Sequence, residues 1–450
     1  MSIATVILAA GKGTRMNSDL PKVLHPIAGA PMLVHAMRAA AALAPERTVI
    51  VAGHGADRVE RAVRAEDGAA QIVVQDQQLG TAHAVRMAQD ALERFSGTVL
   101  VLYGDTPFVR PETLQQMAEA TARHDVVVLG FEAADPGRYG RLVMDGEDLT
   151  RIVEYKDASP KERAITLCNS GVMACPAVHL WDLLARIGDD NAAGEFYLTD
   201  LPALARAAGL RVGIVTCAEA ETLGVNSRAE LAAADALFQE RAKAALMADG
   251  VTLLDPASTY LSADTVIGRD SLIDPNVYFG PGVSVESGVH IRAFSHLEGC
   301  HVARGSVVGP FARLRPGTEL AEDVRVGNFV EVKAAEVAAG AKINHLSYVG
   351  DAQIGPAANM GAGTITCNYD GFAKHRTEIG AGAFIGSNTM LVAPVSVGAG
   401  AMTVTGSVIT RDVPADAIAS ARADQDTKPG RAPKLFKMLK ARAEKARQKG

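Results

Sequence analysis

The chain has 450 residues, which is too many for one ordinary hydrophobic core, so two or three domains are expected. Hydrophobic residues make up 48% and charged residues 21%, as in soluble globular proteins, and a formal net charge of -6 argues against a nucleic-acid-binding protein. Five scattered cysteines without a CxxC pattern argue against a disulfide framework or a structural zinc site.

The same features predict where the protein works. The first residues enter a strand-like run directly, without the basic segment and cleavage site of a secretion signal. No apolar run approaches the roughly 18 residues that span a bilayer. We therefore expect a cytoplasmic protein that does not insert into a membrane.

The first half of the chain alternates short apolar runs with helical stretches. Apolar runs bounded by turns and separated by helices are typical of buried parallel strands, and this predicts a doubly wound, Rossmann-like α/β sheet. Ligands in such sheets bind at the carboxyl ends of the strands. Predicted strands cover residues 5–9, 47–51, 71–74, 98–102 and 125–129, and predicted helices include residues 31–44 and 81–94.

A glycine-rich segment, Ala-Gly-Lys-Gly-Thr-Arg-Met from residue 10 to residue 16, directly follows the first predicted strand. Glycines at such a position let the backbone approach a phosphate and present its N–H groups. The segment is neither a Walker A loop nor a Rossmann fingerprint, since Met16 stands in place of the third glycine. Asp105, after the strand 98–102, could bind Mg²⁺ or cap the following helix.

Together with Pro21-Lys22-Val23-Leu24, the glycine-rich segment resembles the signature of sugar-1-phosphate nucleotidyltransferases. The resemblance continues in order over residues 5–228. Over this length the chain is similar to the family that joins an N-acetylglucosamine-1-phosphate uridyltransferase to a glucosamine-1-phosphate acetyltransferase. It implies that Arg15 and Lys22 act on the phosphates as catalytic cations, and that Asp105 and Asn226 bind Mg²⁺. The residues implied to bind UTP or UDP-N-acetylglucosamine are Leu8, Ala9, Ala10, Gly11, Lys22, Gln75, Gly80, Thr81, Tyr103, Gly104, Asp105, Gly140, Glu154, Asn169 and Asn226.

A linker helix is predicted between the two halves of the chain. Residues 227–250 are rich in alanine, and Leu231, Ala234, Leu237 and Phe238 fall on one stripe of a helix. Gly250 is a suitable stop.

After residue 250 the hydrophobic period changes to six residues. A period of six does not fit a helix of 3.6 residues per turn, and it predicts a β-helix in which three hexapeptides form one coil. Two pairs of aliphatic residues five apart, Val332 with Val337 and Val349 with Ile354, predict locally irregular coils. The family resemblance implies left-handed coils. The recurring residues are Ile267, Ile273, Phe279, Val285, Ile291, Leu297, Val308, Leu314, Leu320, Val326, Val332, Ile379, Ile385, Leu391 and Val397.

A polar insertion between Ile365 and Ile379 breaks this rhythm and predicts a functional loop. Acetyl transfer from a thioester to an amine needs a base, for which a histidine is suited. The resemblance implies that His345 is this catalytic base. It implies that Arg315, Lys333, Tyr348 and Asn359 bind glucosamine-1-phosphate, and that acetyl-CoA is bound by Ala362, Asn368, Tyr369, Ser387, Thr405 and Arg422. Thr405 stands where the family usually has alanine.

The sequence thus predicts three parts: a uridyltransferase domain (residues 1–226), a linker helix (227–250) and a β-helix acetyltransferase domain (251–450) with a basic tail. The expected product is UDP-N-acetylglucosamine, made with Mg²⁺ as cofactor and with acetyl-CoA and UTP as co-substrates. A nucleotidyltransferase with a purely structural β-helix is the alternative, and a non-enzymatic scaffold does not explain the glycine-rich segment. A triangular prism packs well against copies of itself, so we expect a homotrimer. The tail, residues 434–450, has seven cations against Glu444 and predicts a solvated helix or an active-site edge.

Overall fold

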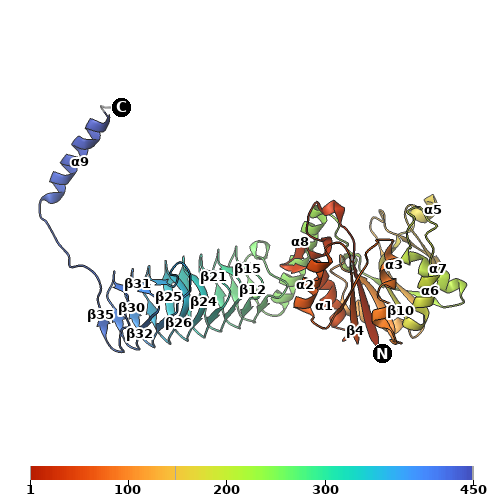
Figure 1. Ribbon diagram of the computed structural model, residues 1–450, viewed down its shortest axis with the longest axis horizontal. Coiled ribbons are helices and arrows are strands. Elements are labelled where there is room, and N and C mark those ends of the chain that lie inside the picture. The colour runs from red at the N-terminus through yellow and green to blue at the C-terminus, as the bar shows by residue number, and fades with distance from the viewer. Residues whose placement is uncertain (1, 147, 448–450) are drawn as a thin grey trace. The chain divides into compact units, whose positions relative to one another are not determined.

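The computed structural model describes residues 2–146 and 148–447, and the chain divides into two compact units (Figure 1). The first unit comprises Met1–Ala245 with Leu261–Asp264, and the second comprises Leu246–Tyr260 with Thr265–Gly450.

The first unit is built on one sheet, in which the inner strand β1 (Ile3–Ala9) is buried along its whole length. Strand β1 pairs in parallel with β4 (Arg47–Ala52) and β6 (Thr98–Tyr103). The strand order is β11-β7-β10-β6-β1-β4-β5. The remaining strands are β5 (Gln71–Val74), β7 (Val126–Glu132), β10 (Leu167–Pro176) and β11 (Val212–Cys217), and β8 (Arg141–Asp145) and β9 (Asp148–Val153) form a hairpin beside β10.

Helices cover both faces of this sheet, as the alternation of apolar runs predicts. Successive residues of β1 point to opposite faces, and Val6 therefore packs in one core cluster while Ile7 packs in the other. Helices α3 (Thr81–Arg86), α6 (Ala177–Ala185) and α7 (Leu201–Ala207) cover the Val6 face. Helices α1 (Met32–Ala41), α2 (Ala56–Glu66) and α4 (Pro111–Ala120) cover the Ile7 face. The predicted doubly wound fold is confirmed.

Two features of this unit differ from the simplest form of that prediction. Strand β10 runs antiparallel to both of its neighbours, β6 and β7, so the sheet is mixed. The helix predicted over residues 81–94 ends at Arg86, and a separate 3₁₀ turn follows at Asp90–Leu92. Between them the amides of Met87, Ala88 and Gln89 bond to carbonyls three residues earlier, which tightens the chain out of the α-helix.

The predicted linker helix is α8 (Arg228–Ala248). Its predicted apolar stripe, Leu231, Ala234, Leu237 and Phe238, packs in a cluster of the first unit that also contains Met32. All but the last three residues of the helix are thus part of the first unit, whose boundary falls after Ala245.

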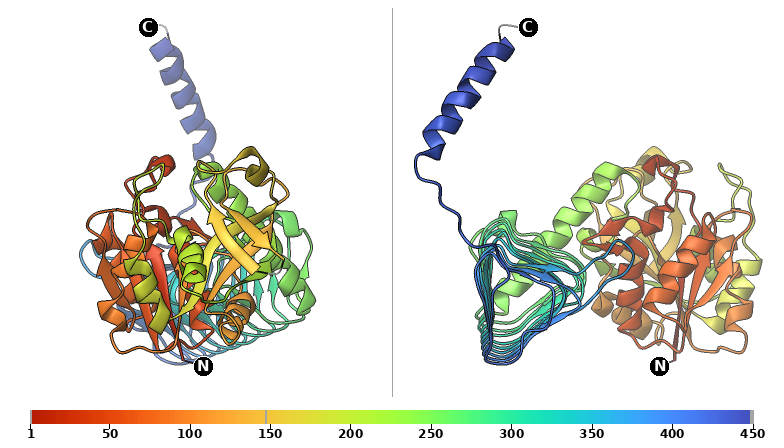
Figure 2. Two further views of the ribbon diagram at one scale, coloured as in Figure 1. Left: turned by 90° about the vertical axis from the view of Figure 1, so that its right-hand side faces the viewer. Right: turned by 60° about the vertical axis from the view of Figure 1, so that its left-hand side comes forward.

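The second unit is a β-helix of triangular outline, seen nearly end-on in the right-hand view of Figure 2. The aliphatic residues of the six-residue period are all buried, and none is more than 6% exposed. Parallel pairing of Leu272 with His290 and of His290 with Val307 shows that one coil takes 17 or 18 residues, which is three hexapeptides. The predicted β-helix is confirmed.

One side of the prism is a sheet in the order β12 (Thr252–Leu253), β14 (Leu272–Ile273), β17 (His290–Ile291), β20 (Val307–Val308), β23 (Arg325–Asn328), β25 (Lys342–His345), β27 (Asn359–Met360), β30 (Phe384–Ile385), β33 (Met402–Thr403) and β35 (Ile418–Ala419). The other two sides contain β13 (Val266–Ile267), β15 (Tyr278–Phe279), β16 (Ser284–Val285), β18 (His296–Leu297), β19 (Cys300–Val302), β21 (Arg313–Leu314), β22 (Thr318–Leu320), β24 (Glu331–Val337), β26 (Tyr348–Ile354), β28 (Ile365–Cys367), β29 (Thr377–Ile379), β31 (Met390–Val392), β32 (Val395–Val397) and β34 (Val408–Ile409).

The predicted irregularity has a simple structural form. Strands β24 and β26 are each seven residues long, and each continues from one side of the prism to the next. Strand β24 accordingly pairs with both β21 and β22 of the preceding coil. The residues five apart, Val332 with Val337 and Val349 with Ile354, lie at the two ends of these strands and are buried.

The basic tail forms helix α9 (Arg431–Arg447), in which every residue is exposed. The last three residues of the predicted tail, 448–450, lie outside the described residues. Among the residues that the structure describes, no helix is long and apolar enough to cross a membrane.

Candidate active sites

The glycine-rich segment leaves β1 at Ala9 and turns back against the segment that contains Lys22. Gly13 has a φ of 58°, in the left-handed region that disfavours other residues. A Cβ atom on Gly13 would collide with the Lys22 side chain. Glycine at this position therefore lets the loop, continued by the 3₁₀ turn Thr14–Met16, lie directly on the turn Lys22–Leu24.

Four polar side chains from distant parts of the sequence meet beside this loop. The Lys22 ammonium donates to the Asp105 carboxylate and, at 3.0 Å, to Oδ1 of Asn226. Arg15 donates to the same Asn226 oxygen at 2.9 Å. The amide of Val225 bonds to the Asp105 carbonyl at 3.1 Å, which joins the segment of Asn226 to the end of β6. The carboxylate and amide oxygens converge on one cation.

A first cavity of about 230 Å³ opens at the carboxyl ends of β1 and β6. Ten of the residues implied to bind the nucleotide line it: Leu8, Ala9, Ala10, Gly11, Lys22, Gln75, Gly80, Thr81, Tyr103 and Asp105. Gly104 is not part of this lining; its amide bonds to the Leu8 carbonyl at 2.9 Å and ties β6 to β1.

Two glutamines line this cavity, and the sequence singled out Gln75 but not Gln78. Nε2 of Gln75 lies 3.2 Å from the Gly80 carbonyl and 2.8 Å from Nδ1 of His83, so the buried Gln75 amide is held in one orientation. Gln78 donates to the carbonyl of Ala10 at 3.0 Å. These contacts depend on the folded loop, and an isolated glutamine in a sequence carries no comparable signal.

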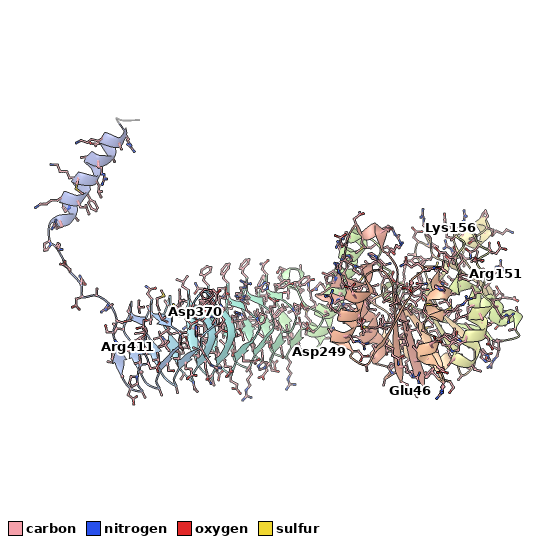
Figure 3. All side chains as sticks on the ribbon, in the orientation of Figure 1. Glu46, Arg151, Lys156, Asp249, Asp370 and Arg411 are labelled. Carbon is pink, nitrogen blue, oxygen red and sulfur yellow. The ribbon has the colours of Figure 1, made fainter. Side chains whose placement is uncertain are left out.

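A second cavity of about 720 Å³ adjoins the first, and Thr81, Tyr103 and Glu195 line both. Its lining contains the residues implied for the sugar side, Gly140, Glu154 and Asn169, together with Asn226. The sequence did not single out Glu195, or Lys156, which also lines this cavity and is labelled in Figure 3.

Two ionisable groups of the second cavity are withdrawn from water. Burial raises the pKa of the Glu154 carboxyl above its usual value. Burial also raises the pKa of the Tyr103 hydroxyl, with the Asp105 charge acting in the same direction. Polar groups in such surroundings make stronger hydrogen bonds to a ligand than they would in water.

In the second unit, His345 lies at the end of β25, next to Asn328 at the end of β23. The two residues are register partners in successive coils, and Nδ1 of His345 lies 2.9 Å from Oδ1 of Asn328. With the amide oxygen accepting, Nδ1 donates this hydrogen bond, and Nε2 is the ring nitrogen left to contact a substrate. Asn328 was not predicted from the sequence, because its role depends on the pairing of two coils.

The residues implied for the sugar phosphate occur on neighbouring coils. Arg315 donates to Oε1 of Glu331 at 2.9 Å, and Glu331 is the register partner of Tyr348. Lys333 lies two residues further along the same strand, β24, and pairs with Gly350. Asn359 lies on another side of the prism, on β27, where its register partner is Lys342.

Three of the residues implied for acetyl-CoA form a row along one edge of the prism. Register pairs Met360 with Ile385 and Ile385 with Thr403, so the residues two further on, Ala362, Ser387 and Thr405, stand at equivalent positions of three coils. Backbone bonds from Asn388 to Ala362 and from Gly406 to Ser387 hold this edge. Arg422 is exposed and follows the final strand, β35.

The predicted functional loop leaves the prism after β28 and appears as a blue loop outside the triangular outline in Figure 2. A carboxylate oxygen of Asp370 (labelled in Figure 3) lies 2.6 Å from Nε2 of His375, and the Lys374 ammonium lies 4.2 Å from the centre of the Tyr369 ring. Backbone N–H groups of the loop, foremost that of Ala373, hold the pKa of Asp370 well below its usual value.

The base of the loop is tied to the prism, while its tip is free. The buried Asn368 amide donates to Asp351 and to the Tyr348 hydroxyl, the latter at 3.4 Å. Phe372 at the tip is 97% exposed. The base of the loop is thus held in place, and its hydrogen bond to β26 joins two residues implied for different substrates, Asn368 and Tyr348.

A metal ion fits the first unit only with help from a substrate. Throughout residues 2–146 and 148–447, no three His, Cys, Asp or Glu side chains gather as a metal site. Asp105 and Asn226 nevertheless offer two oxygens to one cation, the Lys22 ammonium. Mg²⁺ is commonly held by one or two protein oxygens together with substrate phosphates, so the pair fits that ion.

The fold and these sites define a class of protein: a nucleotidyltransferase joined to a hexapeptide-repeat transferase. The family model described as "MobA-like NTP transferase domain" matches residues 5–220, and the model "Bacterial transferase hexapeptide (six repeats)" matches residues 264–299. Both descriptions agree with the units described above, and the second supports the predicted left-handed β-helix.

Curated relatives extend over the whole chain. "Bifunctional protein GlmU" of Ruegeria sp. (strain TM1040) is 66% identical over 98% of this chain and 98% of its own length. The protein of the same name from Cereibacter sphaeroides (strain ATCC 17025 / ATH 2.4.3) is 64% identical over 100% of this chain and 99% of its own length. The one from Ruegeria pomeroyi is 67% identical over 98% of this chain and 98% of its own length.

The chain belongs to the family of the bifunctional protein GlmU. It is therefore a bifunctional enzyme, with a nucleotidyltransferase unit and a hexapeptide acetyltransferase unit, as the sequence resemblance implies. The alternative, a nucleotidyltransferase with a purely structural β-helix, is therefore not supported.

Proposed function

We propose that the two units catalyse successive steps: N-acetylation of glucosamine-1-phosphate by the β-helix, then uridylyl transfer from UTP by the α/β unit. The convergence of Arg15, Lys22, Asp105 and Asn226 beside two adjoining cavities carries the assignment of the second step. One cavity is suited to a nucleotide and the other to a sugar, and the charged groups lie where both ligands would bring their phosphates.

Uridylyl transfer requires no nucleophilic side chain. A phosphate oxygen of N-acetylglucosamine-1-phosphate attacks the α-phosphorus of UTP, and the bond from that phosphorus to the bridging oxygen breaks to release pyrophosphate. Arg15 and Lys22 hold the phosphates and balance the charge that accumulates on the departing oxygens. The fixed Gln75 amide offers an oxygen to the uracil N–H, and Glu154 and Asn169 accept or donate hydrogen bonds to the sugar.

Mg²⁺ held by Asp105 and Asn226 would neutralise phosphate charge and orient the triphosphate. The Lys22 ammonium contacts both of these oxygens, so it would compete with the ion for them. We therefore expect the Lys22 ammonium to move toward the phosphates when UTP and the metal bind.

In acetyl transfer, the amine of glucosamine-1-phosphate attacks the thioester carbonyl, the carbon–sulfur bond breaks, and the CoA thiolate leaves. Nε2 of His345 takes the proton from the attacking nitrogen, and Asn328 fixes the ring through Nδ1. Arg315 and Lys333 supply positive charge for the sugar phosphate. The row Ala362, Ser387 and Thr405 supplies an edge along which the extended CoA chain binds.

We further propose that three copies assemble through their β-helices. The residues assigned to acetyl transfer lie on two sides of the prism and on a projecting loop, so one prism offers them along its surface. A neighbouring prism would enclose the substrate, and a three-fold ring closes such a contact. The exposed Phe372 at the loop tip is suited to reach that neighbour.

Pyrophosphate release tests the nucleotide assignment. Asp105→Asn keeps the shape of the side chain but removes a charge from the proposed metal site, and it should raise the Mg²⁺ concentration needed for half-maximal rate. Asp90→Asn, the same change at an exposed position elsewhere in the same unit, is the control. An unchanged Mg²⁺ dependence in Asp105→Asn would contradict the proposal.

A further inference from the structure

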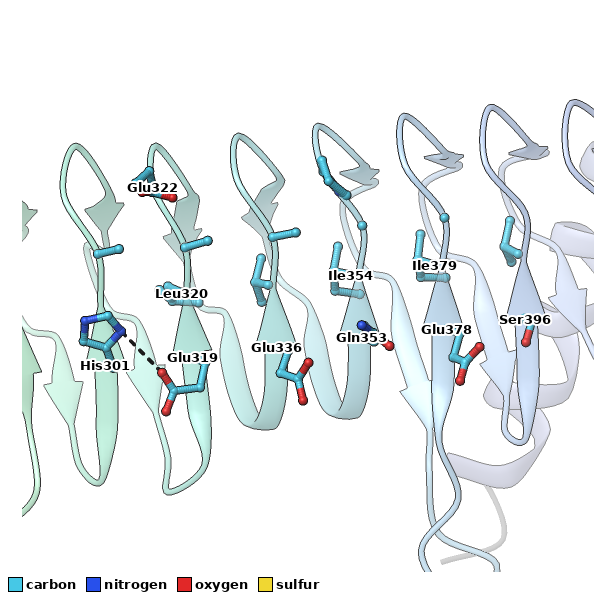
Figure 4. Close-up of a pocket in the computed structure, with 18 of the residues that line it drawn as sticks. His301, Glu319, Leu320, Glu322, Glu336, Gln353, Ile354, Glu378, Ile379 and Ser396 are labelled. Atoms are coloured by element: carbon cyan, nitrogen blue, oxygen red, sulfur yellow. Dashed lines mark ion pairs between the residues drawn. The ribbon is translucent and has the colours of Figure 1, made fainter.

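A groove of about 730 Å³ runs along one face of the β-helix (Figure 4). It follows β19, β22, β24, β26, β29 and β32, each of which pairs in parallel with the next. None of the residues assigned above to acetyl transfer is among the described residues that line this groove. The groove is therefore a surface that the two reactions do not explain.

The rim of the groove is a ladder of six polar side chains, three of which are glutamates. Register places the following residues at equivalent positions of successive coils: His301, Glu319, Glu336, Gln353, Glu378 and Ser396. Adjacent strands are about 4.8 Å apart, so like charges on neighbouring coils repel each other. His301 lies 3.3 Å from both Glu286 and Glu319, and Arg376 lies 3.7 Å from Glu336, so two glutamates of the ladder already have a basic neighbour. The described lining as a whole still has an excess of acidic side chains.

The floor of the groove is formed by small residues that follow the buried aliphatic positions. They are Ala303, Ala321, Ala338, Gly355, Gly380 and Gly398. The three alanines present only methyl groups, and at the three glycines the place of a Cβ atom is taken by the backbone of the next coil, so the floor carries no polar side chain. An acidic rim above an apolar floor fits a basic amphipathic segment.

Helix α9 of the same chain has this character. Its cations are Arg431, Lys434, Lys437, Lys440, Arg442, Lys445 and Arg447, and its acidic residue is Glu444. Apolar residues three or four apart form a stripe, namely Ala432, Leu435, Phe436, Leu439, Ala443 and Ala446. Phe436 is 66% exposed, and an isolated helix of this length is only marginally stable in water.

We propose that α9 docks in this groove, with its apolar stripe on the floor and its cations on the acidic ladder. The lengths match: six strands span about 24 Å, and a helix of 17 residues is about 25 Å long. Residues 420–430 join β35 to α9 and can extend to about 36 Å, while one hexapeptide side of the prism is at most about 20 Å. The helix can therefore reach the groove of its own prism or, in an assembly, that of a neighbouring copy.

A basic amphipathic helix can also bind an anionic membrane surface. The docking proposal is favoured because the same chain carries a groove of complementary charge and matching length. If α9 bound a membrane instead, substitutions in the groove would not change its protection from exchange. Docking and membrane binding can therefore be separated by experiment.

Hydrogen exchange of the α9 amides in the full-length protein tests the proposal. Docking should slow exchange by about tenfold or more relative to a free peptide of the same sequence. Glu319→Lys combined with Glu336→Lys should abolish this protection. Glu93→Lys combined with Glu240→Lys makes the same charge change at exposed positions outside the groove and should leave it intact.

Charge reversal on α9 provides a second test, in which the sequence of the β-helix is unchanged. Lys437→Glu with Lys440→Glu should also abolish protection, and the combination with the reversed groove should restore it. Unprotected α9 amides in the wild-type protein would overturn the proposal. Protection that survives groove reversal, or that arises only with phosphatidylglycerol vesicles, would overturn it as well.

Discussion

Replacing His345 by alanine separates catalysis from folding in the second unit. The side chain is exposed, and its hydrogen bond reaches only Asn328 of the preceding coil. Its loss leaves no buried cavity, and the free energy of unfolding should change by no more than about 0.5 kcal/mol. A large loss of acetyl transfer in this variant would therefore reflect chemistry.

The structure also predicts a graded series. Loss of a general base lowers the rate by roughly 10²- to 10⁴-fold. Asn328→Ala keeps the base and removes one hydrogen bond that fixes its tautomer, at a cost of about 1 kcal/mol or roughly fivefold in rate. We expect acetyl transfer to fall in the order wild type, Asn328→Ala, His345→Ala.

The assay is CoA release with glucosamine-1-phosphate, measured over roughly pH 6–9. Uridylyl transfer in the same preparations serves as the internal control and should be unchanged. The rate of acetyl transfer in His345→Ala should stay roughly a hundredfold or more below that of the wild type throughout this range. Wild-type rates in His345→Ala across the range would refute the assignment, and an equal loss in Asn328→Ala would refute the role given to the hydrogen bond.

Other changes test the first unit and the boundary between the units. Asp105→Ala should abolish uridylyl transfer and leave acetyl transfer near wild type; equal loss of both, with unchanged circular dichroism, would contradict separate sites. Gly13→Ala should lower the free energy of unfolding by about 1–2 kcal/mol because Gly13 has a positive φ, and thermal melting would show this loss. The same change should displace Lys22 and therefore slow uridylyl transfer, measured as pyrophosphate release. A fragment cut after Ser227 should melt lower than residues 1–264, since it lacks the α8 stripe that packs on the first unit; equal melting temperatures would contradict that packing. Residues 251–450 should be trimeric by light scattering and should acetylate glucosamine-1-phosphate, whereas a fully active monomer would contradict a shared site.

The sequence predicted the fold well where a hydrophobic period was strict. The six-residue period predicted the β-helix because every aliphatic position, from Ile267 onward, faces the interior of the prism. It also predicted the long strands β24 and β26 as irregular coils. The antiparallel direction of β10 was not predicted, because a buried strand has the same apolar pattern whether it runs parallel or antiparallel to its neighbours.

The sites were predicted unevenly for a similar physical reason. Motif residues such as Lys22 and Asp105 follow strands whose ends meet at one edge of the sheet, so their proximity follows from the topology. Residues that act by holding another side chain have no such signature. Gln78 and Asn328 were therefore found only when the loop and the coils were seen folded.

The central claim is that one chain performs both steps, and a single reaction tests it most directly. The full-length protein is supplied with glucosamine-1-phosphate, acetyl-CoA labelled in its acetyl group, UTP and Mg²⁺, and the products are separated and weighed by mass spectrometry. The account predicts UDP-N-acetylglucosamine that carries the label, with CoA and pyrophosphate released in equal amounts. UTP consumption only when N-acetylglucosamine-1-phosphate is added, with no CoA released from glucosamine-1-phosphate, would contradict it.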